Sequence, residues 1–324
     1  MEEKLNTQIQ YVCEKIFKQE TTEIKKVSRL SWRNVVYKCT TTDEVYAFKF
    51  FLPISNYQNR VLVEKFFLEN ANSVLDMRAP NILYSDIEAE TPLLVMDWID
   101  GESLKAKLRN QGLTNENKTL LKDCISRLEG VWQCSYNNLP YDNLAMNKSG
   151  DIRSISMLSN RMGLSNEDAF SKTQELRKSF ARQIDEMEVT YNGLTIGTLD
   201  KLFLINSDVS LHECICRDND MYFIDMERFT LGNPNNDLAC VFTSAINEFD
   251  NDYDSVQKVL KIVEGSPYFD RRLFLTYFIE KILSENYVDY ENISDNKFSF
   301  YLKIADMIKK KIHIVNHECI GEDR

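Results

Sequence analysis

The strongest change in the spacing of apolar residues along the chain lies near residue 100, and this change limits the folds available to it. Before that point, β-branched and aromatic runs at 35–40, 45–51 and 92–98 predict strands, with TTDE as a hairpin connection between the first two. After it, apolar residues take the spacing of helices, which we expect at 114–134, 166–188, 270–285 and 294–312. The sequence therefore predicts an α+β chain of two lobes, residues 1–100 and 101–324.

The first lobe also contains two predicted helices. An amphipathic helix lying on a larger body is indicated by apolar residues at spacings of four, three and four, namely Leu5, Ile9, Val12 and Ile16. A second helix is expected over 59–71, inserted between the second and third strands. In the second lobe, Asp270 is placed to cap the helix that follows it.

Composition and charge narrow the class of protein. The chain has 324 residues, of which 43% are hydrophobic and 27% charged, and this describes a globular protein with a sizeable core. Its 39 basic and 50 acidic residues give a net charge of −11, which argues against nucleic acid or an anionic membrane as partner and favours a cationic or neutral one. No apolar run reaches the length of a membrane span and the N-terminus lacks a signal-peptide core, so a cytoplasmic protein is expected.

Lys49 lies inside the apolar strand run 45–51, where a charged side chain needs an anionic partner. Glu64, fifteen positions later in the inserted helix, is placed to provide one. In kinases, a lysine on a strand paired with a glutamate on a helix positions the α- and β-phosphates of ATP. The alternative interpretation is a lysine that protects a strand edge from aggregation.

Three carboxylates follow in the second lobe. Asp208 precedes Glu213 by five residues, and Asp225 follows the short apolar run 222–224. Kinase catalytic loops carry, in this order, an aspartate that orients the acceptor hydroxyl, a metal-binding side chain five positions later, and a second metal-binding aspartate at the end of a strand. The segment RDND at 217–220 supplies a turn, so we expect the three carboxylates to converge through a hairpin.

With these motifs the chain resembles the aminoglycoside phosphotransferase and choline kinase-like group of small-molecule kinases, which share the protein-kinase fold. The resemblance rests on LVMDWIDGESL (94–104), NSDVSLHECI (206–215) and YFIDMERFTLGNPNNDLA (222–239), and it covers about residues 25–245. It implies a bilobal fold with a small N-terminal β-sheet lobe and a larger helical C-terminal lobe, and a reaction that uses ATP and Mg²⁺.

The resemblance also implies roles for individual residues. Asp208 would be the catalytic base, Asp225 the principal magnesium ligand, and Asp237 a structural residue that braces the catalytic loop from the next helix. The hinge between the lobes would lie in MDWID, where backbone groups near Asp97 and Ile99 would face the adenine edge.

Three positions depart from the family pattern. Glu213 stands where the family has asparagine; a carboxylate can still bind magnesium, but it adds negative charge beside the phosphates. The segment 28–38, expected to cover the phosphates, contains no glycine, so Ser31 and Asn34 would supply donors in place of closely approaching backbone amides. Asn206 replaces the histidine two positions before the catalytic aspartate, which changes how the loop is braced.

The acidic run NEFDNDYD, at 247–254, offers a hint about the acceptor. In the resembled family, acidic side chains of the helical lobe receive cationic acceptors, a role that would fall here to Asp250, Asp252 and Asp254. A solvated acidic loop is the alternative interpretation.

The cysteines and histidines do not indicate a zinc site, because eight cysteines without a CxxC pair are accompanied by only three histidines. Cys214 and Cys216 alternate on a short predicted strand and are expected to pack in the core. His212 is expected to be structural or exposed, since it lies at a position in the loop that the chemistry does not require.

Two classes of function are therefore open. The first is an ATP- and Mg²⁺-dependent kinase that phosphorylates a hydroxyl group of a small molecule, cationic or neutral. The second is a nucleotide-binding pseudokinase with a regulatory or scaffolding role, in which Glu213 and the altered phosphate segment have removed the transfer activity. A protein substrate is disfavoured, because no A-P-E signature follows Asp225.

Overall fold

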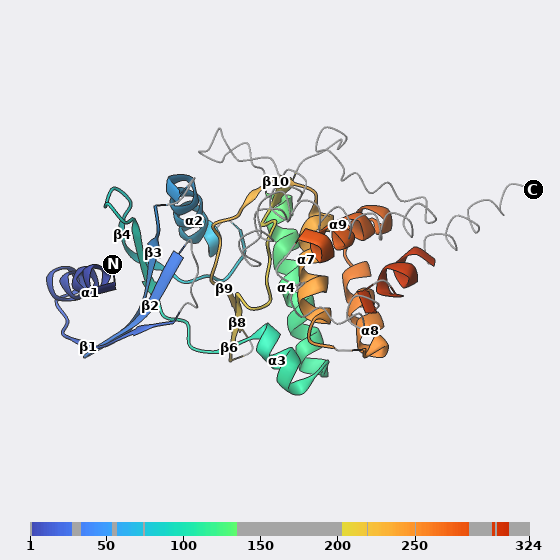
Figure 1. Ribbon diagram of the computed structural model, residues 1–324, viewed down its shortest axis with the longest axis horizontal. Coiled ribbons are helices and arrows are strands. Elements are labelled where there is room, and N and C mark those ends of the chain that lie inside the picture. The colour runs from blue at the N-terminus through green and yellow to red at the C-terminus, as the bar shows by residue number, and fades with distance from the viewer. Residues whose placement is uncertain are drawn as a thin grey trace, which may run out of the picture. The chain divides into compact units, whose positions relative to one another are not determined.

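The chain divides into two compact units, one made of Met1–Glu102 and Glu213–Phe229 and the other of Ser103–His212 and Thr230–Arg324. Figure 1 shows the elements of both in the computed structural model. The residues described are 2–27, 34–53, 57–73, 75–134, 203–218, 220–249, 251–284, 300, 301 and 303–310. The division predicted at residue 100 lies close to the observed one, but 213–229 joins the first unit instead of the second.

The first unit is built on a five-stranded antiparallel sheet with the strand order β1-β2-β3-β5-β4. Its strands are β1 (Thr21–Lys26), β2 (Asn34–Thr41), β3 (Val45–Phe51), β4 (Ile82–Asp86) and β5 (Leu93–Asp97). The three predicted strands are the central ones, and TTDE forms the β2–β3 hairpin, in which the Thr41 N–H donates to the Glu44 carbonyl. β1 and β4 form the edges, where largely solvated residues lack the apolar run that indicates a strand.

The two faces of this sheet have different partners. One face packs against the N-terminal helical segment through alternate side chains of β3, namely Tyr46, Phe48 and Phe50. Because side chains alternate along a strand, Lys49 points to the opposite face. Asn34 is paired with Phe51 across the β2–β3 ladder and therefore shares that face with Lys49. This second face holds the contacts to helix α2 (Tyr57–Ala71), which is inserted between β3 and β4 as predicted.

The first face is covered by two elements, helix α1 (Glu2–Tyr11) and the π-helical turn η1 (Val12–Phe17). Leu5, Ile9 and Val12 are buried, as the predicted amphipathic helix requires. The prediction for Ile16 is wrong, since this side chain is 44% exposed. A π turn contains more residues than an α turn, so the buried side advances along the chain and Cys13 packs beside Val12 in the core.

The segment 213–229 adds a β-hairpin to the first unit. Its strands are β8 (Cys214–Arg217) and β9 (Asp220–Phe223), with β6 (Glu102–Ser103) as a third strand beside β8. The Phe223 N–H donates to the Arg78 carbonyl at 2.9 Å. Gly101 lies so close to β8 that a Cβ atom there would stand 2.4 Å from the Cys216 carbonyl oxygen. These backbone contacts attach the hairpin to the first unit, and the Cys214 and Cys216 side chains are buried as predicted.

The second unit is mainly helical. Its described helices are α3 (Leu104–Gln111), α4 (Asn115–Gln133), α7 (Pro234–Ile246), α8 (Tyr253–Glu264) and α9 (Arg271–Ser284), and the described residues between 300 and 310 are helical too. A short ladder pairs β7 (Phe203–Ile205) with β10 (Thr230–Gly232). Every residue of α7 is buried, which makes it the central helix of this unit.

Three of the four helices predicted for this unit are found, at α4, at α9 and within 300–310. Asp270 caps α9 by accepting hydrogen bonds from the N–H groups of Arg272 and Leu273. The helix predicted at 166–188 lies outside the described residues.

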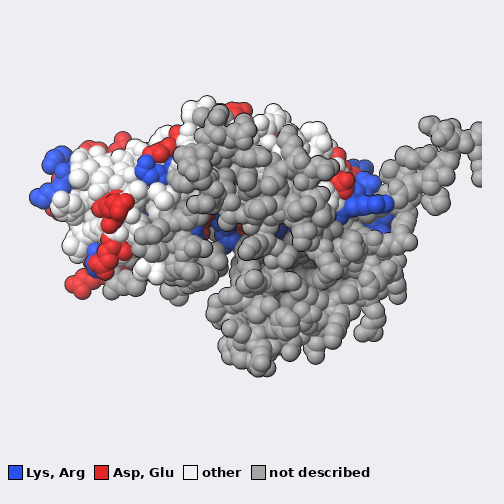
Figure 2. Space-filling view, turned by 90° about the horizontal axis from the view of Figure 1, so that it is seen from above, with Lys and Arg blue, Asp and Glu red and all other residues white. Residues whose placement is uncertain are grey.

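Within the described part of the chain, no helix combines the length and the apolar character that crossing a membrane requires. On the face shown in Figure 2, basic and acidic side chains are interspersed at the α1 and β1 end of the first unit, with no patch of a single sign there.

Candidate active site

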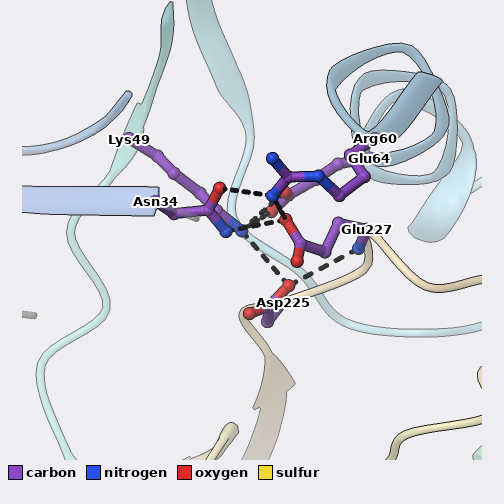
Figure 3. Close-up of polar contacts among 6 residues, drawn as sticks. All are labelled: Asn34, Lys49, Arg60, Glu64, Asp225 and Glu227. Atoms are coloured by element: carbon purple, nitrogen blue, oxygen red, sulfur yellow. Dashed lines mark hydrogen bonds and ion pairs between the residues drawn. The ribbon is translucent and has the colours of Figure 1, made fainter. Parts of the chain in front are cut away.

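Lys49 of β3, Glu64 of α2 and Asp225, two residues after β9, meet in the first unit (Figure 3). The Lys49 Nζ atom lies 2.8 and 2.5 Å from the two carboxylate oxygens of Glu64 and 3.2 Å from Oδ1 of Asp225. The side chains of Lys49 and Glu64 are 4% and 0% exposed, against 31% for Asp225. The predicted ion pair is therefore present and buried, and Asp225 extends it toward solvent.

Burial and charge act in opposite directions on this pair. Burial disfavours the Lys49 ammonium, but the carboxylates of Asp225, Glu64 and Glu227 outweigh it and raise the pKa of Lys49. Burial raises the pKa of Glu64 to about 8, and nearby Asp225 and Glu227 add to this rise against the lowering influence of Lys49. The carboxylates of the cluster are thus not fully neutralised by the neighbouring cations, and an added cation would reduce the repulsion among them.

A second set of contacts lies beside the first and was not predicted from the sequence. The Glu227 Oε2 atom accepts hydrogen bonds from the Asn34 Nδ2 atom at 2.7 Å and from the Arg60 Nη1 atom at 3.3 Å. Arg60 also donates to the Asn34 Oδ1 atom at 3.0 Å, so the three side chains contact one another in pairs (Figure 3). Glu227 is buried, although it lies in a loop between β9 and β10.

The spacing of these residues explains the arrangement. Arg60, Glu64 and Phe67 lie on one face of α2, since they are separated by four and three residues. Arg60 contacts Glu227, Glu64 is linked through Lys49 to Asp225, and Phe67 stacks on Phe229 with ring centroids 3.8 Å apart. One face of the helix thus meets alternate residues of the segment 225–229. Residues 227 and 228 form a turn, so no strand or helix spacing in the sequence signals this role of Glu227.

Asp225 fits a divalent cation better than the other carboxylates of the cluster. The contacts found for its carboxylate among the described residues go to Oδ1, from the Lys49 ammonium and the Glu227 N–H, and its side chain is partly exposed. Oxygen ligands of this kind suit Mg²⁺. Glu64, Asp225 and Glu227 are close enough to share an ion, but the Lys49 ammonium already lies between the first two. A metal would therefore bind on the exposed side of Asp225.

Glu213, the other predicted metal ligand, is held near Asp225 by the hairpin. The Ile224 N–H donates to the Glu213 carbonyl at 3.1 Å, so Glu213 and Asp225 flank the open end of the β8–β9 ladder. This agrees with the predicted hairpin. A metal contact of the Glu213 side chain stays a prediction, as does the convergence of these carboxylates with Asp208, which belongs to the second unit.

In the second unit, Asp237 of α7 holds the backbone just before Asp208. Its carboxylate accepts the N–H of Asn206 at 3.0 Å and of Ser207 at 2.7 Å, and also the indole N–H of Trp132 at 3.0 Å. The predicted bracing role of Asp237 is therefore confirmed. Burial raises the pKa of Asp237 to about 6, although these three hydrogen bonds lower it.

The other predicted nucleotide contacts are placed as follows. Asn34 lies in the cluster, but its amide is engaged with Glu227 and Arg60, so donating to a phosphate would require an exchange of those contacts. Asp97 ends β5, and Ile99 follows two residues later; their adenine contacts stay predictions. Ser31 lies outside the described residues.

The acidic run has local structural roles. Asp252 caps α8 by accepting the Ser255 N–H at 3.1 Å, and Asp254 pairs with Lys258 one turn later on the same helix. Asp250 lies outside the described residues. These contacts favour the solvated-loop interpretation, and an acceptor-binding role for the run stays a prediction. His212 is exposed, in agreement with the sequence.

Neither a protein-family model nor a curated protein matches the sequence, but solved structures match the fold. Spectinomycin phosphotransferase APH(9)-Ia, in complex with ADP and spectinomycin, superposes with a TM-score of 0.63 at 13% identity, over 94% of this chain and 98% of that one. The GDP and kanamycin complex of APH(2″)-IIIa gives 0.60 at 11% identity, over 95% and 99%. Amicoumacin kinase hAmiN, with AMP-PNP and Ca²⁺, gives 0.59 at 12% identity, over 96% of each chain.

These likenesses define the class of fold. The chain has the α+β, protein-kinase-like fold of the aminoglycoside phosphotransferases, as the sequence predicted. Because all three identities are below 25%, the comparison is one of fold, and the reaction has to be argued from the residues.

Proposed function

We propose that this protein transfers the γ-phosphoryl group of ATP to a hydroxyl group of a small molecule, with Mg²⁺. The observation that supports it most is the buried Lys49–Glu64 pair in contact with Asp225, within a fold shared with phosphotransferases whose structures contain ADP or GDP. A surface lysine that guards a strand edge would not be 4% exposed on a central strand.

The first unit would bind the nucleotide. Lys49, held in place by Glu64, would contact the phosphates, and backbone groups near Asp97 and Ile99 would contact the base. Asp225 would hold the magnesium ion, with Glu213 as a second ligand. The bound ion would neutralise phosphate charge during transfer.

The second unit would activate the acceptor. As the acceptor oxygen bonds to the γ-phosphorus, the bond from this phosphorus to the β-phosphate oxygen breaks and ADP leaves, while the hydroxyl proton moves to the Asp208 carboxylate. The acceptor is proposed to be small and cationic, since the net charge of −11 favours such an encounter.

The test is a screen of hydroxyl-bearing small molecules, cationic and neutral, with purified protein, Mg²⁺ and labelled ATP or GTP. Asp208→Asn should reduce turnover by ~10²-fold or more, as expected for loss of a general base, while nucleotide binding stays nearly intact. Asp218→Asn, at an exposed turn of the β8–β9 hairpin, is the matched control and should keep full activity.

An Asp208→Asn variant with the rate of the parent would remove Asp208 from the mechanism. Nucleotide binding without transfer to any acceptor would instead favour the pseudokinase. The structures compared above are named as phosphotransferases or kinases and lend that alternative no support.

A further inference from the structure

Ser207 has an unusual backbone conformation directly before the proposed catalytic base. Its φ of 63° lies in the left-handed region, which residues other than glycine rarely adopt. Such a conformation persists only where the surrounding structure holds it. The residue that follows is Asp208, so the groups that hold Ser207 also set where the Asp208 main chain begins.

Two buried charged side chains contact the backbone of Ser207, one at its N–H group and the other at its carbonyl group. Asp237 of α7 accepts the N–H groups of Asn206 and Ser207. Lys281 of α9 donates from Nζ to the Ser207 carbonyl at 3.0 Å, and it is only 5% exposed. Cys240 adds a weaker contact to the same carbonyl, with its Sγ atom at 3.7 Å.

These contacts fix three consecutive peptide planes. The N–H groups of Asn206 and Ser207 belong to the planes 205–206 and 206–207, which Asp237 holds. The Ser207 carbonyl belongs to the plane 207–208, whose other end is the N–H of Asp208. Because a peptide unit is planar, Lys281 fixes the orientation of the plane that enters Asp208, which Asp237 does not reach directly.

Burying the Lys281 ammonium costs free energy that an apolar side chain in the same place would not require. The aromatic packing between α7 and α9, with Phe242 against Phe274 and Phe278, holds the two helices together without it. We propose that Lys281 is a positioning residue for the catalytic loop: its hydrogen bond to the Ser207 carbonyl holds Asp208 in the orientation that proton acceptance requires. The catalytic part of this inference rests on the proposed function.

The alternative is that Lys281 only neutralises Asp237, whose pKa it lowers. Three variants separate the two roles. Lys281→Arg keeps the charge and a donor, Lys281→Gln keeps a donor without the charge, and Lys281→Met removes both. Lys303→Gln and Lys303→Met, at an exposed helical position, are the matched controls.

The first measurement is kcat and KM per folded molecule. Lys281→Met should lower kcat on the order of 10²-fold, the effect of misplacing a catalytic group, with little change in KM for the nucleotide. Lys281→Arg and Lys281→Gln should each recover part of the loss. If Lys281→Met does not fold, the proposal is supported when kcat falls from the parent to Lys281→Arg and again to Lys281→Gln. Both of these variants should also have a lower kcat than the Lys303 controls, which should match the parent. A kcat of Lys281→Gln equal to the parent's, or as low as that of a folded Lys281→Met, overturns it.

The second measurement does not need activity. Amide hydrogen exchange of residues 206–208 should be about tenfold faster in Lys281→Gln than in the parent, whereas the Lys303 controls leave it unchanged. If the parent transferred phosphate to no acceptor, this result would still establish the positioning contact, and only the proposed function would fail. Unchanged exchange at these amides in every Lys281 variant overturns the positioning role itself.

Discussion

Replacing Arg60 by methionine should loosen helix α2, and the size of the effect can be worked out from its contacts. Arg60 and Glu227 are 13% and 4% exposed, and breaking a buried ion pair typically costs ~3–5 kcal/mol. Asn34 still contacts whichever partner remains, so we expect the lower end, ~2–3 kcal/mol for Arg60→Met or Glu227→Gln. The double variant should lose less than the sum, with a coupling of ~1–2 kcal/mol.

Native-state hydrogen exchange of the α2 amides measures this directly, because it reports the free energy of opening of that helix without assuming that both units unfold together. Lys65 and Glu69 provide the matched control on the same helix, since their ion pair is 26% and 47% exposed. The same substitutions there, Lys65→Met and Glu69→Gln, should show a coupling of only ~0.3–0.5 kcal/mol. Equal couplings for the two pairs would refute the conclusion that the Arg60–Glu227 contact fastens α2 to the segment after Asp225.

Further outcomes are expected at the proposed nucleotide, metal and acceptor contacts. Lys49→Ala and Asp225→Ala should each weaken binding of Mg²⁺–ATP in calorimetry, and a variant that binds as tightly as the parent would lose its proposed role. Glu213→Asn should improve binding of metal-free ATP by relieving repulsion, so a lower affinity would contradict the argument. Replacing Asp250, Asp252 and Asp254 together by asparagine should raise the KM for the acceptor and leave the affinity for ATP unchanged. Asparagine at position 252 can still cap α8.

The central strands and the Lys49–Glu64 pair were predictable because a charged residue in an apolar strand needs a partner, and the next helix offered one. The positions that were not predicted depend on local backbone geometry and on contacts between segments that are far apart in the sequence. Ile16 fits an α-helical spacing and is exposed only because the helix changes to a π turn. From the sequence, Glu227 is one carboxylate in a loop. It contacts Arg60 because the segment after β9 packs against α2.

Buried charge marks the two places where the proposed chemistry would occur. Among the described residues, the charged residues that are buried as whole residues are Lys49, Glu64, Glu227, Asp237 and Lys281. The first three surround Asp225, the proposed metal ligand, and the last two hold the loop that leads to Asp208. Outside these clusters the Glu248 side chain is also only 5% exposed, but its partners Lys105 and Arg109 are 26% and 64% exposed. Since buried charges are costly, the gathering of the five buried residues in two clusters is better explained by function than by stability.

The titration of Asp237 provides a pH test in which loop order and stability change in opposite directions. Its folded pKa of about 6 lies above the ordinary value of 3.8, so the folded state retains a proton that the unfolded chain releases between these values. The contribution of this group to stability therefore falls as the pH rises from about 4 to 6. The ionised carboxylate is nevertheless the better acceptor for its three donors, so order in the loop before Asp208 should increase over the same interval.

The indole N–H of Trp132 reports this change, because it donates to the Asp237 carboxylate. Its NMR resonance, assigned with Trp132→Phe, should titrate with a midpoint near pH 6, and Lys281→Gln should move the midpoint upward, since Lys281 lowers the pKa of Asp237. Lys303→Gln should leave it in place. A Trp132 resonance that does not change between pH 5 and 7 would show that Asp237 does not titrate in this range. A midpoint that Lys281→Gln does not move would show that the Lys281 ammonium does not act on the Asp237 carboxylate.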